Sequence, residues 1–187
     1  MENSEIYYKN IDENIDNANY LYDGYLQMEL CIVAEKCKRA IDTGGTVYLI
    51  GNGGSAADAQ HIAAEFVVKL KEKRKALPAV ALTTDTSVLT AIGNDFGFEE
   101  IFARQINALC TSKDILIALS TSGTSVNITK AIDEALAIKL PVVLFTSIQA
   151  PYISRVHMIR VPGTNSSRIQ ESYMVLLHTL VEMVENE

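Results

Sequence analysis

The sequence predicts an α/β protein in which helices cover both faces of a doubly wound parallel sheet. Two observations carry the prediction: short apolar runs alternate with helical segments from residue 44 onward, and those runs are apolar throughout, as strands covered on both sides are. A chain of 187 residues fits one domain, and no linker, repeat or low-complexity segment divides it. We therefore expect a helical extension over residues 1–43 and an α/β domain over residues 44–187, joined in a single structural unit.

The first 43 residues are mostly polar but carry apolar side chains at helical spacing. That spacing predicts an amphipathic helix whose inner face consists of Leu26, Leu30, Val33, Cys37 and Ala40. Thr43-Gly44-Gly45 should end this helix. The segment is also rich in tyrosines that fit either an oligomer interface or ordinary surface and core positions: Tyr7, Tyr8, Tyr20, Tyr22 and Tyr25.

Apolar runs of β-favouring residues predict the strands: Thr46–Ile50, Ala79–Leu82, Ile115–Leu119, Val142–Phe145 and Met158–Val161. Helical segments are expected around residues 56–71, 87–92, 99–110, 125–139 and 168–186, with a turn over Asn94–Phe98. In an open α/β sheet, ligands bind beyond the carboxyl ends of the strands. The loops that follow the strands are therefore the candidate site.

Charge and composition exclude several classes of protein. The net charge is −7, from 16 Lys and Arg against 23 Asp and Glu, and no stretch is basic enough for a nucleic-acid interface. No apolar run approaches the ~18 residues that a membrane span needs, and the polar, acidic N-terminus is unlike a signal peptide. Cys31, Cys37 and Cys110 are odd in number and lack CxxC spacing, so we expect reduced, buried thiols. These features predict a cytoplasmic protein that binds neither nucleic acid nor membrane.

Two loops have the composition of anion-binding turns. Gly51–Ser55 follows the first predicted strand and offers free backbone N–H groups and an N-cap at Ser55, although such a turn also serves simply to join strand to helix. It is not GxGxxG and no Walker lysine follows, so we expect no nucleotide cofactor. After the third strand, Ser120–Ser125 sets five hydroxyls and a glycine before a helix. Serine and threonine are common in turns, but this loop also suits a sugar phosphate.

Four side chains on two helical segments are candidates for chemistry. His61 and Glu65 are four residues apart on one helix face, which fits a surface contact, half of a metal site or an acid/base pair. Gln170 and His178 are eight residues apart, so they too can face the same side of a helix. His178 alone, among apolar neighbours, would ordinarily be a packed core histidine. Its role depends on whether it meets the first pair in space.

Four segments together resemble the sugar isomerase (SIS) domain family and, more narrowly, its phosphoheptose isomerases: GNGGSAADAQHIAAEF, TTDTSVLTAIGNDFGFEEIFARQ, STSGTSVN and the terminal RIQE followed by a histidine. The resemblance covers nearly the whole chain and keeps the motifs in order. It implies a SIS domain with a flavodoxin-like sheet of five parallel strands, assembled as a homotetramer with active sites at subunit interfaces. It also implies an aldose–ketose isomerase acting on sedoheptulose 7-phosphate and D-glycero-D-manno-heptose 7-phosphate.

The resemblance further implies roles for particular residues. Glu65 and His178 would be the acid/base pair, and Gln170 would hold substrate oxygens. The implied substrate contacts are Asn52, Gly53, Gly54, Ser55, Glu65, Asn94, Asp95, Ser120, Thr121, Ser122, Ser125 and Gln170. Those in the loop at residues 120–125 would bind the phosphate. In metal-bearing members a zinc ion is held by residues that match His61, Glu65, Gln170 and His178.

The chain departs from the family pattern in four places. Lys69 replaces an arginine of many members, which keeps the charge but loses the bidentate fork. Ser167 stands where an aspartate is frequent, and Tyr173 stands where many members have a second histidine. The stretch Thr146–Tyr152 lacks a Gly-Gly pair. These departures bear on recognition of the sugar tail more than on the chemistry.

Aldose–ketose isomerisation moves one proton between adjacent carbons and another between their oxygens, through an enediolate. We hypothesise that Glu65 abstracts the carbon-bound proton and His178 shuttles the oxygen-bound one, although the sequence does not decide which residue moves which proton. Zinc or hydrogen-bond donors would stabilise the negative charge. Two alternatives stay open: a non-catalytic SIS-domain protein that regulates or binds a partner, and an isomerase of another sugar phosphate. The heptose product would feed nucleotide-activated heptose for lipopolysaccharide core, capsule or other surface glycans.

Overall fold

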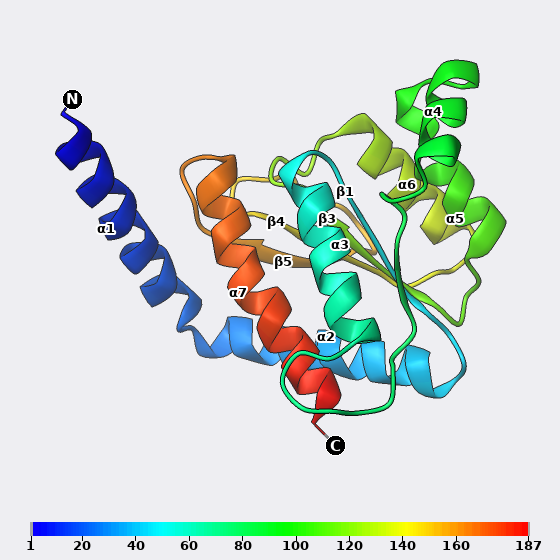
Figure 1. Ribbon diagram of the computed structural model, residues 1–187, viewed down its shortest axis with the longest axis horizontal. Helices are drawn as coiled ribbons and strands as arrows, with labels where there is room; N and C mark the ends of the chain where they lie inside the picture. Colours follow the sequence, from blue (N-terminus) through cyan, green and yellow to red (C-terminus); the bar gives the residue numbers. More distant parts are fainter. Residues whose placement is uncertain (1, 187) are drawn as a thin grey trace.

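The computed structural model describes residues 2–186 and has a five-stranded sheet with helices on both faces (Figure 1). The strands are β1 (Val47–Gly51), β2 (Ala79–Ala81), β3 (Ile115–Leu119), β4 (Val142–Ser147) and β5 (His157–Val161). They pair in parallel in the order β2-β1-β3-β4-β5, which is the flavodoxin-like order. The predicted doubly wound α/β fold is therefore confirmed, and each predicted strand is present within two residues of its expected bounds.

Two layers of helices cover the sheet. The helices are α1 (Asn3–Leu21), α2 (Gly24–Asp42), α3 (Gly54–Val67), α4 (Thr86–Asp95), α5 (Ala103–Leu109), α6 (Val126–Ala137) and α7 (Ser166–Glu185), with a 3-10 turn η1 (Phe98–Glu100). Helices α2, α3 and α7 pack on one face, and α4, α5 and α6 on the other. Alternate residues of β3 enter opposite cores: Ile115 and Ile117 face α3 and α7, whereas Leu116 and Ala118 face α6. This period of two explains why β3 is apolar throughout.

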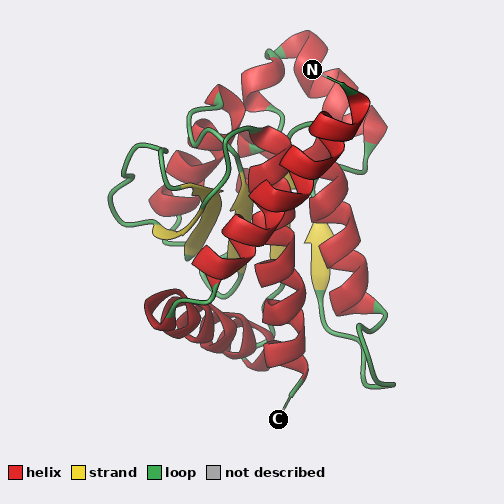
Figure 2. Ribbon diagram, turned by 90° about the vertical axis from the view of Figure 1, so that its left-hand side faces the viewer, coloured by secondary structure: helices red, strands yellow, loops and turns green. Residues whose placement is uncertain are grey.

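The N-terminal segment forms two helices. Helix α2 is the predicted amphipathic helix, buries all five expected residues and ends at Thr43, followed by Gly44 with a φ of 81°. Helix α1 lies to the left in Figure 1 and in the foreground of Figure 2, where it packs along α7. Within residues 3–21, Asn17 is the single buried residue. Residues of α2 share one core cluster with residues of α3 and α7. The boundary at residue 43 between a helical extension and an α/β domain stays a prediction.

Three local expectations are wrong, each for a physical reason. The turn expected from Asn94 begins later, because α4 continues through Asp95 and the chain turns at Gly97, whose φ is 99°. The helix expected through residue 71 ends at Val67, because Arg74 folds back and donates to the carbonyl oxygens of the last turn. Ser55 is not an N-cap: Gly53, with a φ of 55°, caps α3, and Ser55 lies inside the first turn.

The cysteines and the membrane expectation can be compared with the described residues. Within residues 2–186 no helix is both long enough and apolar enough to cross a membrane. Cys31, Cys37 and Cys110 are free thiols; the last two are buried, and burial raises the pKa of each to about 12. Cys31 is partly exposed, so the expectation of buried thiols is wrong for that residue.

Candidate active site

The carboxyl ends of β1 and β3 and the N-termini of α3, α6 and α7 meet at one edge of the sheet, the upper edge in Figure 1. Side-chain hydrogen bonds join these elements. Asn52, after β1, and Asn127, on α6, exchange two amide hydrogen bonds of 2.8 and 2.7 Å. The hydroxyl of Thr121, after β3, lies 3.2 Å from that of Ser166 at the start of α7. Three helix N-termini thus point their free N–H groups and positive dipole ends toward one region, as anion-binding sites do.

The loop Ser120–Ser125 lies between β3 and α6. Ser120 is buried and its Oγ accepts a hydrogen bond from the Gly123 N–H at 3.2 Å, which holds the loop in a tight turn. Ser122 is exposed and its Oγ accepts from the Thr124 N–H, also at 3.2 Å. Ser125 is the N-cap of α6, but its side chain makes no capping hydrogen bond. Its hydroxyl therefore remains available, together with the first N–H groups of the helix, for a ligand.

A buried polar network joins the first turn of α3 to α7. Ser55 Oγ lies 2.7 Å from the Tyr173 hydroxyl and accepts from Gln170 Nε2 at 3.3 Å. The Tyr173 hydroxyl in turn donates to Asp58 Oδ2 at 3.1 Å. Burial raises the pKa of Tyr173 and also that of Asp58. A Cβ atom at Gly54 would lie 2.4 Å from Gln170 Nε2, so the Gln170 amide can approach α3 only because this position is glycine.

The two pairs expected on α3 and α7 come together. His61 Nε2 lies 2.9 Å from His178 Nε2 and 3.7 Å from Glu65 Oε1. The two imidazole rings are nearly perpendicular, with an interplanar angle of 89°. Two nitrogens facing each other at this distance share a single proton, so one is the donor and the other the acceptor. Glu65 and His178 therefore lie within a few ångströms of the same nitrogen atom, in a place where the side chain of His61 is half exposed.

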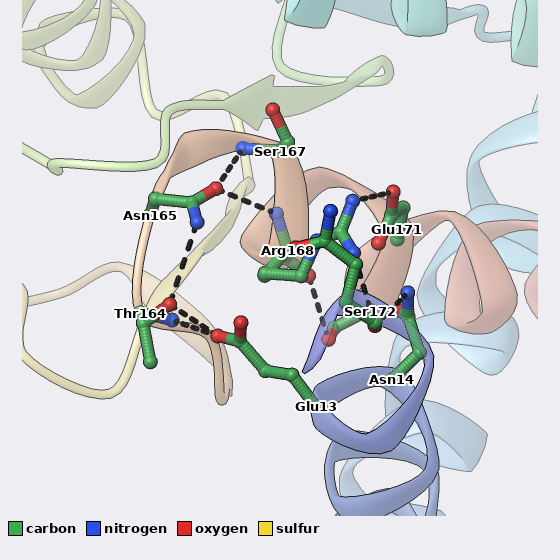
Figure 3. Close-up of polar contacts among 9 residues, drawn as sticks. Glu13, Asn14, Thr164, Asn165, Ser167, Arg168, Glu171 and Ser172 are labelled. Atoms are coloured by element: carbon green, nitrogen blue, oxygen red, sulfur yellow. Dashed lines mark hydrogen bonds and ion pairs between the residues drawn. The ribbon is translucent and has the colours of Figure 1, made fainter. Parts of the chain in front are cut away.

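The start of α7 is held by its own cap and by α1 (Figure 3). The Asn165 side chain accepts from the N–H groups of Ser167 and Arg168 at 3.0 and 3.2 Å. Glu13 on α1 accepts from both the N–H and the hydroxyl of Thr164, and Arg168 donates to a carbonyl oxygen of α1 at 3.2 Å. Helix α1 thereby helps to set the position of the helix that carries Gln170 and His178.

Asn94 and Asp95 are not brought to this group of residues. Both residues are exposed at the end of α4. The Asn94 side chain donates a hydrogen bond to Asp95 at 2.7 Å. Helix α4 lies at the far right of the upper edge in Figure 1, well away from α7.

His61, His178 and Glu65 bring together donor atoms of the kinds that zinc binds. Zn–N bonds of about 2.0–2.1 Å set the nitrogens of a tetrahedral site about 3.3–3.4 Å apart. The separations around His61 Nε2, 2.9 Å to His178 and 3.7 Å to Glu65, fall on either side of that value, and imidazole and carboxylate are zinc ligands. Within residues 2–186 no three His, Cys, Asp or Glu side chains form a closed metal-binding group. The side chains around His61 are therefore of the kinds that bind zinc, but their present spacing does not form a zinc site.

Three residues that contribute to the site were missed in the sequence as functional positions. Asn127 lies within the STSGTSVN motif, but nothing local indicates its bond to Asn52, 75 residues away. In the sequence, Tyr173 stands out only as a departure from the family pattern. A signal did exist for Tyr173 and Asp58, because each lies three residues from a candidate residue, Gln170 or His61, and so shares its helix face.

The chain is similar to known proteins in both sequence and fold. The family model of the SIS domain matches residues 23–147. The chain is 45% identical to a phosphoheptose isomerase from Burkholderia pseudomallei (strain K96243) over 193 residues, which cover 100% of this chain and 97% of that protein. A solved phosphoheptose isomerase structure from Francisella tularensis matches with 30% identity and a TM-score of 0.94 over 100% of both chains. One from Neisseria gonorrhoeae matches with 34% identity and a TM-score of 0.88, over 97% of this chain and 99% of that one.

Proposed function

The chain belongs to the SIS domain family and, within it, to the phosphoheptose isomerases, and we propose that it converts sedoheptulose 7-phosphate to D-glycero-D-manno-heptose 7-phosphate. It is an isomerase by this membership. The observation that carries the proposal is the meeting of Glu65 and His178 around His61 Nε2, beside a region where three helix N-termini converge. An acid/base pair and an anion-binding region are the two parts that isomerisation of a sugar phosphate needs.

The phosphate is assigned to the loop Ser120–Ser125, through hydroxyls and N–H groups of the α6 N-terminus. This neutral site suits a chain with a net charge of −7, because local dipoles rather than bulk charge hold the anion. Asn52, through its bond to Asn127, ties this loop to the glycine-rich turn after β1. The other end of the sugar would then lie near the facing sides of α3 and α7, where Glu65 and His178 are found.

Glu65 is assigned the transfer of the carbon-bound proton and His178 that of the oxygen-bound proton. A carboxylate can hold a proton on either oxygen, and a neutral imidazole can give one up at one nitrogen and take one at the other. Gln170 is assigned to hold a substrate oxygen. His61 lies between the two acid/base groups and supports both, since its Nε2 is within reach of each.

A zinc ion is proposed as cofactor, held by His61, Glu65, Gln170 and His178, and no nucleotide cofactor is proposed. Zinc would supply Lewis-acid polarisation of the substrate carbonyl and stabilise negative charge on oxygen. The fit of His61, His178 and Glu65 to zinc chemistry supports this part of the proposal. A side chain that binds the metal through one atom must use its other atom to move a proton, which both a carboxylate and an imidazole allow.

Assembly as a homotetramer with active sites at subunit interfaces is proposed as well. Helix α1 exposes a set of large apolar side chains: Ile6, Tyr7, Tyr8, Ile11, Ile15 and Tyr20. Apolar patches of this kind are typical of protein interfaces. The position of Asn94 and Asp95 on α4, which lies apart from α7 in Figure 1, also supports completion by a neighbouring subunit. The enzyme is proposed to act in the cytoplasm, with a product that feeds nucleotide-activated heptose for lipopolysaccharide, capsule or other surface glycans.

The test is an isomerase assay with sedoheptulose 7-phosphate, run in parallel with ketose phosphates of five and six carbons. The expected result is conversion of the seven-carbon substrate, with solvent deuterium appearing at the carbon that exchanges its proton. Faster turnover of a shorter ketose phosphate would assign a different substrate. Stabilisation of the fold by sugar phosphates without any turnover would favour a non-catalytic regulatory protein.

A further inference from the structure

We propose that Tyr173 and Asp58 are positioning residues which, acting through Ser55, determine which way the side-chain amide of Gln170 faces. The four side chains form an unbroken series of hydrogen bonds, which we call the hydrogen-bond relay: Asp58 to Tyr173 at 3.1 Å, Tyr173 to Ser55 at 2.7 Å, and Ser55 to Gln170 at 3.3 Å. The proposal deepens the proposed isomerase function and rests on it for the role of Gln170.

The direction of each bond in the relay follows from the chemistry at one end. An ionised carboxylate only accepts hydrogen bonds, so Asp58 takes the single proton of the Tyr173 phenol. The phenol oxygen then has only lone pairs to offer, and the Ser55 hydroxyl must donate to it. Ser55 in turn has only lone pairs left, and it can bond only the Nε2 of Gln170. The carboxylate of Asp58 thus dictates the amide orientation of a residue on another helix.

Burial leaves the two hydroxyl groups of this series no partners outside the four side chains. Tyr173 is 0% exposed and Ser55 is 5% exposed, so neither hydroxyl can turn to water instead. A buried hydroxyl without a hydrogen-bond partner is unfavourable, so each group keeps its place in the series. The amide of Gln170 also lies against Gly54, where the absence of a Cβ lets Nε2 come close to the first turn of α3.

The consequence for the site is that Gln170 presents an acceptor. With Nε2 engaged by Ser55, the Oε1 atom is the free end of the amide, and it can accept a hydroxyl proton or bind a cation. A reversed amide would instead present two N–H donors. An N–H group can neither accept a hydrogen bond from a substrate hydroxyl nor bind a cation. The relay therefore selects the polarity of this part of the site.

The first measurement needs no substrate. Protein labelled with 15N-glutamine gives side-chain amide signals for Gln27, Gln60, Gln105, Gln149 and Gln170, and the Gln170 signal is the one that Gln170→Glu removes. In Tyr173→Phe, we expect the Gln170 signal to move toward the position of solvent-exposed amides. Tyr48→Phe is the matched control, because it deletes a phenol oxygen bonded to the Leu109 carbonyl on a different part of the fold. A Gln170 signal that is the same in wild type and Tyr173→Phe would overturn the relay.

The second measurement reverses the relay. In Gln170→Glu, a carboxylate oxygen faces Ser55, so Ser55 would have to donate its proton to residue 170. While Asp58 is ionised it accepts the Tyr173 proton, and Ser55 must then donate to Tyr173 instead. Asp58→Asn can turn its amide N–H to the phenol and release that proton toward Ser55. We expect Gln170→Glu to lose about 10- to 100-fold in kcat/KM, as for a lost polar contact. Asp58→Asn alone should lose less, because its amide oxygen can still accept the Tyr173 proton. The double variant should have a higher kcat/KM than Gln170→Glu alone.

Losses that simply multiply in the double variant would refute the directional mechanism and leave a structural role only. Asp133→Asn, an exposed position on α6, controls for the change in net charge. Tyr173→Phe and Tyr48→Phe are compared for stability as well, so that loss of fold is separated from loss of orientation. If the wild type has no isomerase activity, the proposed function fails, while the amide spectra still decide whether the relay exists.

Discussion

Asn52 and Asn127 hold each other by two amide hydrogen bonds, 2.8 and 2.7 Å long, between the glycine-rich turn after β1 and the first turn of α6. Each amide uses both its oxygen and its nitrogen toward the other, so neither is left unpaired at this point. Asn127 is 3% exposed. The pair fixes the distance between the glycine-rich turn and the loop proposed to bind phosphate, and it is the link on which the shape of that end of the site depends.

Asn127→Ala should lower both stability and affinity. The substitution leaves the Asn52 amide without its hydrogen-bond partner, so we expect the free energy of unfolding in urea to fall by about 1–3 kcal/mol. We also expect a higher KM for the sugar phosphate. Asn107→Ala is the matched control, because its amide donates to Glu134 at an exposed site, where a change of at most about 0.5 kcal/mol is usual. Equal destabilisation by the two substitutions would argue against a structural link at Asn52.

Glu65→Gln should abolish most turnover. The amide is nearly the same size as the carboxylate but cannot take up a proton, so we expect kcat to fall by about 10²- to 10⁴-fold if Glu65 is the base. Glu35→Gln, on the exposed face of α2, should leave kcat unchanged. Near-normal turnover by the Glu65 variant, measured with sedoheptulose 7-phosphate, would exclude the carboxylate from proton transfer.

Removal and return of zinc tests the proposed cofactor. After dialysis against a chelator, we expect activity to fall and to return with added zinc, and we expect His61→Gln to reduce the zinc bound per chain. His157→Gln is the matched control, since His157 lies away from α3 and pairs with Glu29 at 2.7 Å. Full activity of a preparation shown by metal analysis to contain no zinc would remove the metal from the proposal.

The pair Arg74–Glu185 should make stability depend on pH. Burial opposes ionisation of Glu185, but hydrogen bonds from the Leu70 N–H and from Arg74 outweigh it, so its pKa is lowered from 4.5. The stabilisation is therefore fully present when the pH is above the pKa of Glu185 in the unfolded chain. It is lost as the pH falls through the lower pKa that Glu185 has in the folded protein. Glu185→Gln should unfold more easily than wild type at pH 7, and the difference should close below pH 4.5.

The size of that difference follows from the contacts of the carboxylate. Hydrogen bonds to charged groups contribute about 1.5–3 kcal/mol, so we expect a loss in this range in urea unfolding at pH 7. Glu182→Gln, which breaks the more exposed pair with Lys71, should change stability by less than about 1 kcal/mol. A Glu185→Gln effect that does not shrink as the pH falls from 7 to below the folded-state pKa of Glu185 would mean that ionisation is not what stabilises this contact.

Charged substitutions on α1 should dissociate the proposed tetramer. Ile11 and Ile15 are one helical turn apart and 43% and 54% exposed in a single chain. Ile11→Glu with Ile15→Glu would place two carboxylates in an apolar interface, and sedimentation analysis should show smaller species. Lys9→Glu, which alters a polar position of the same helix, is the control for charge. An unchanged mass for the double variant would place the subunit contacts elsewhere.

Much of the fold can be derived from the sequence because its signals are local. The run Ile115–Leu119 is apolar at every position, which is what a strand buried on both faces requires, and glycines and hydroxyl residues mark the loops that follow the strands. The same holds for α2, whose apolar spacing alone gives its buried face. The proposed roles of Glu65, Gln170 and His178 rest on motif resemblance, since spacing along one helix does not distinguish a core histidine from a catalytic one.

Only the tertiary structure decides which of these local features meet. Helix α7 lies beside α3, which sets His61 against His178 across 117 residues of chain and sets Tyr173 between Ser55 and Asp58. No periodicity in the sequence encodes that adjacency, because it results from how the apolar faces of separate helices pack on one sheet. The end of α3 at Val67 depends on how the loop after it folds back: the Arg74 guanidinium donates to the carbonyl oxygens of Phe66 and Glu65, eight and nine residues before it. Hydrogen bonds between elements depend on packing, whereas strands and turns depend on neighbours in the chain.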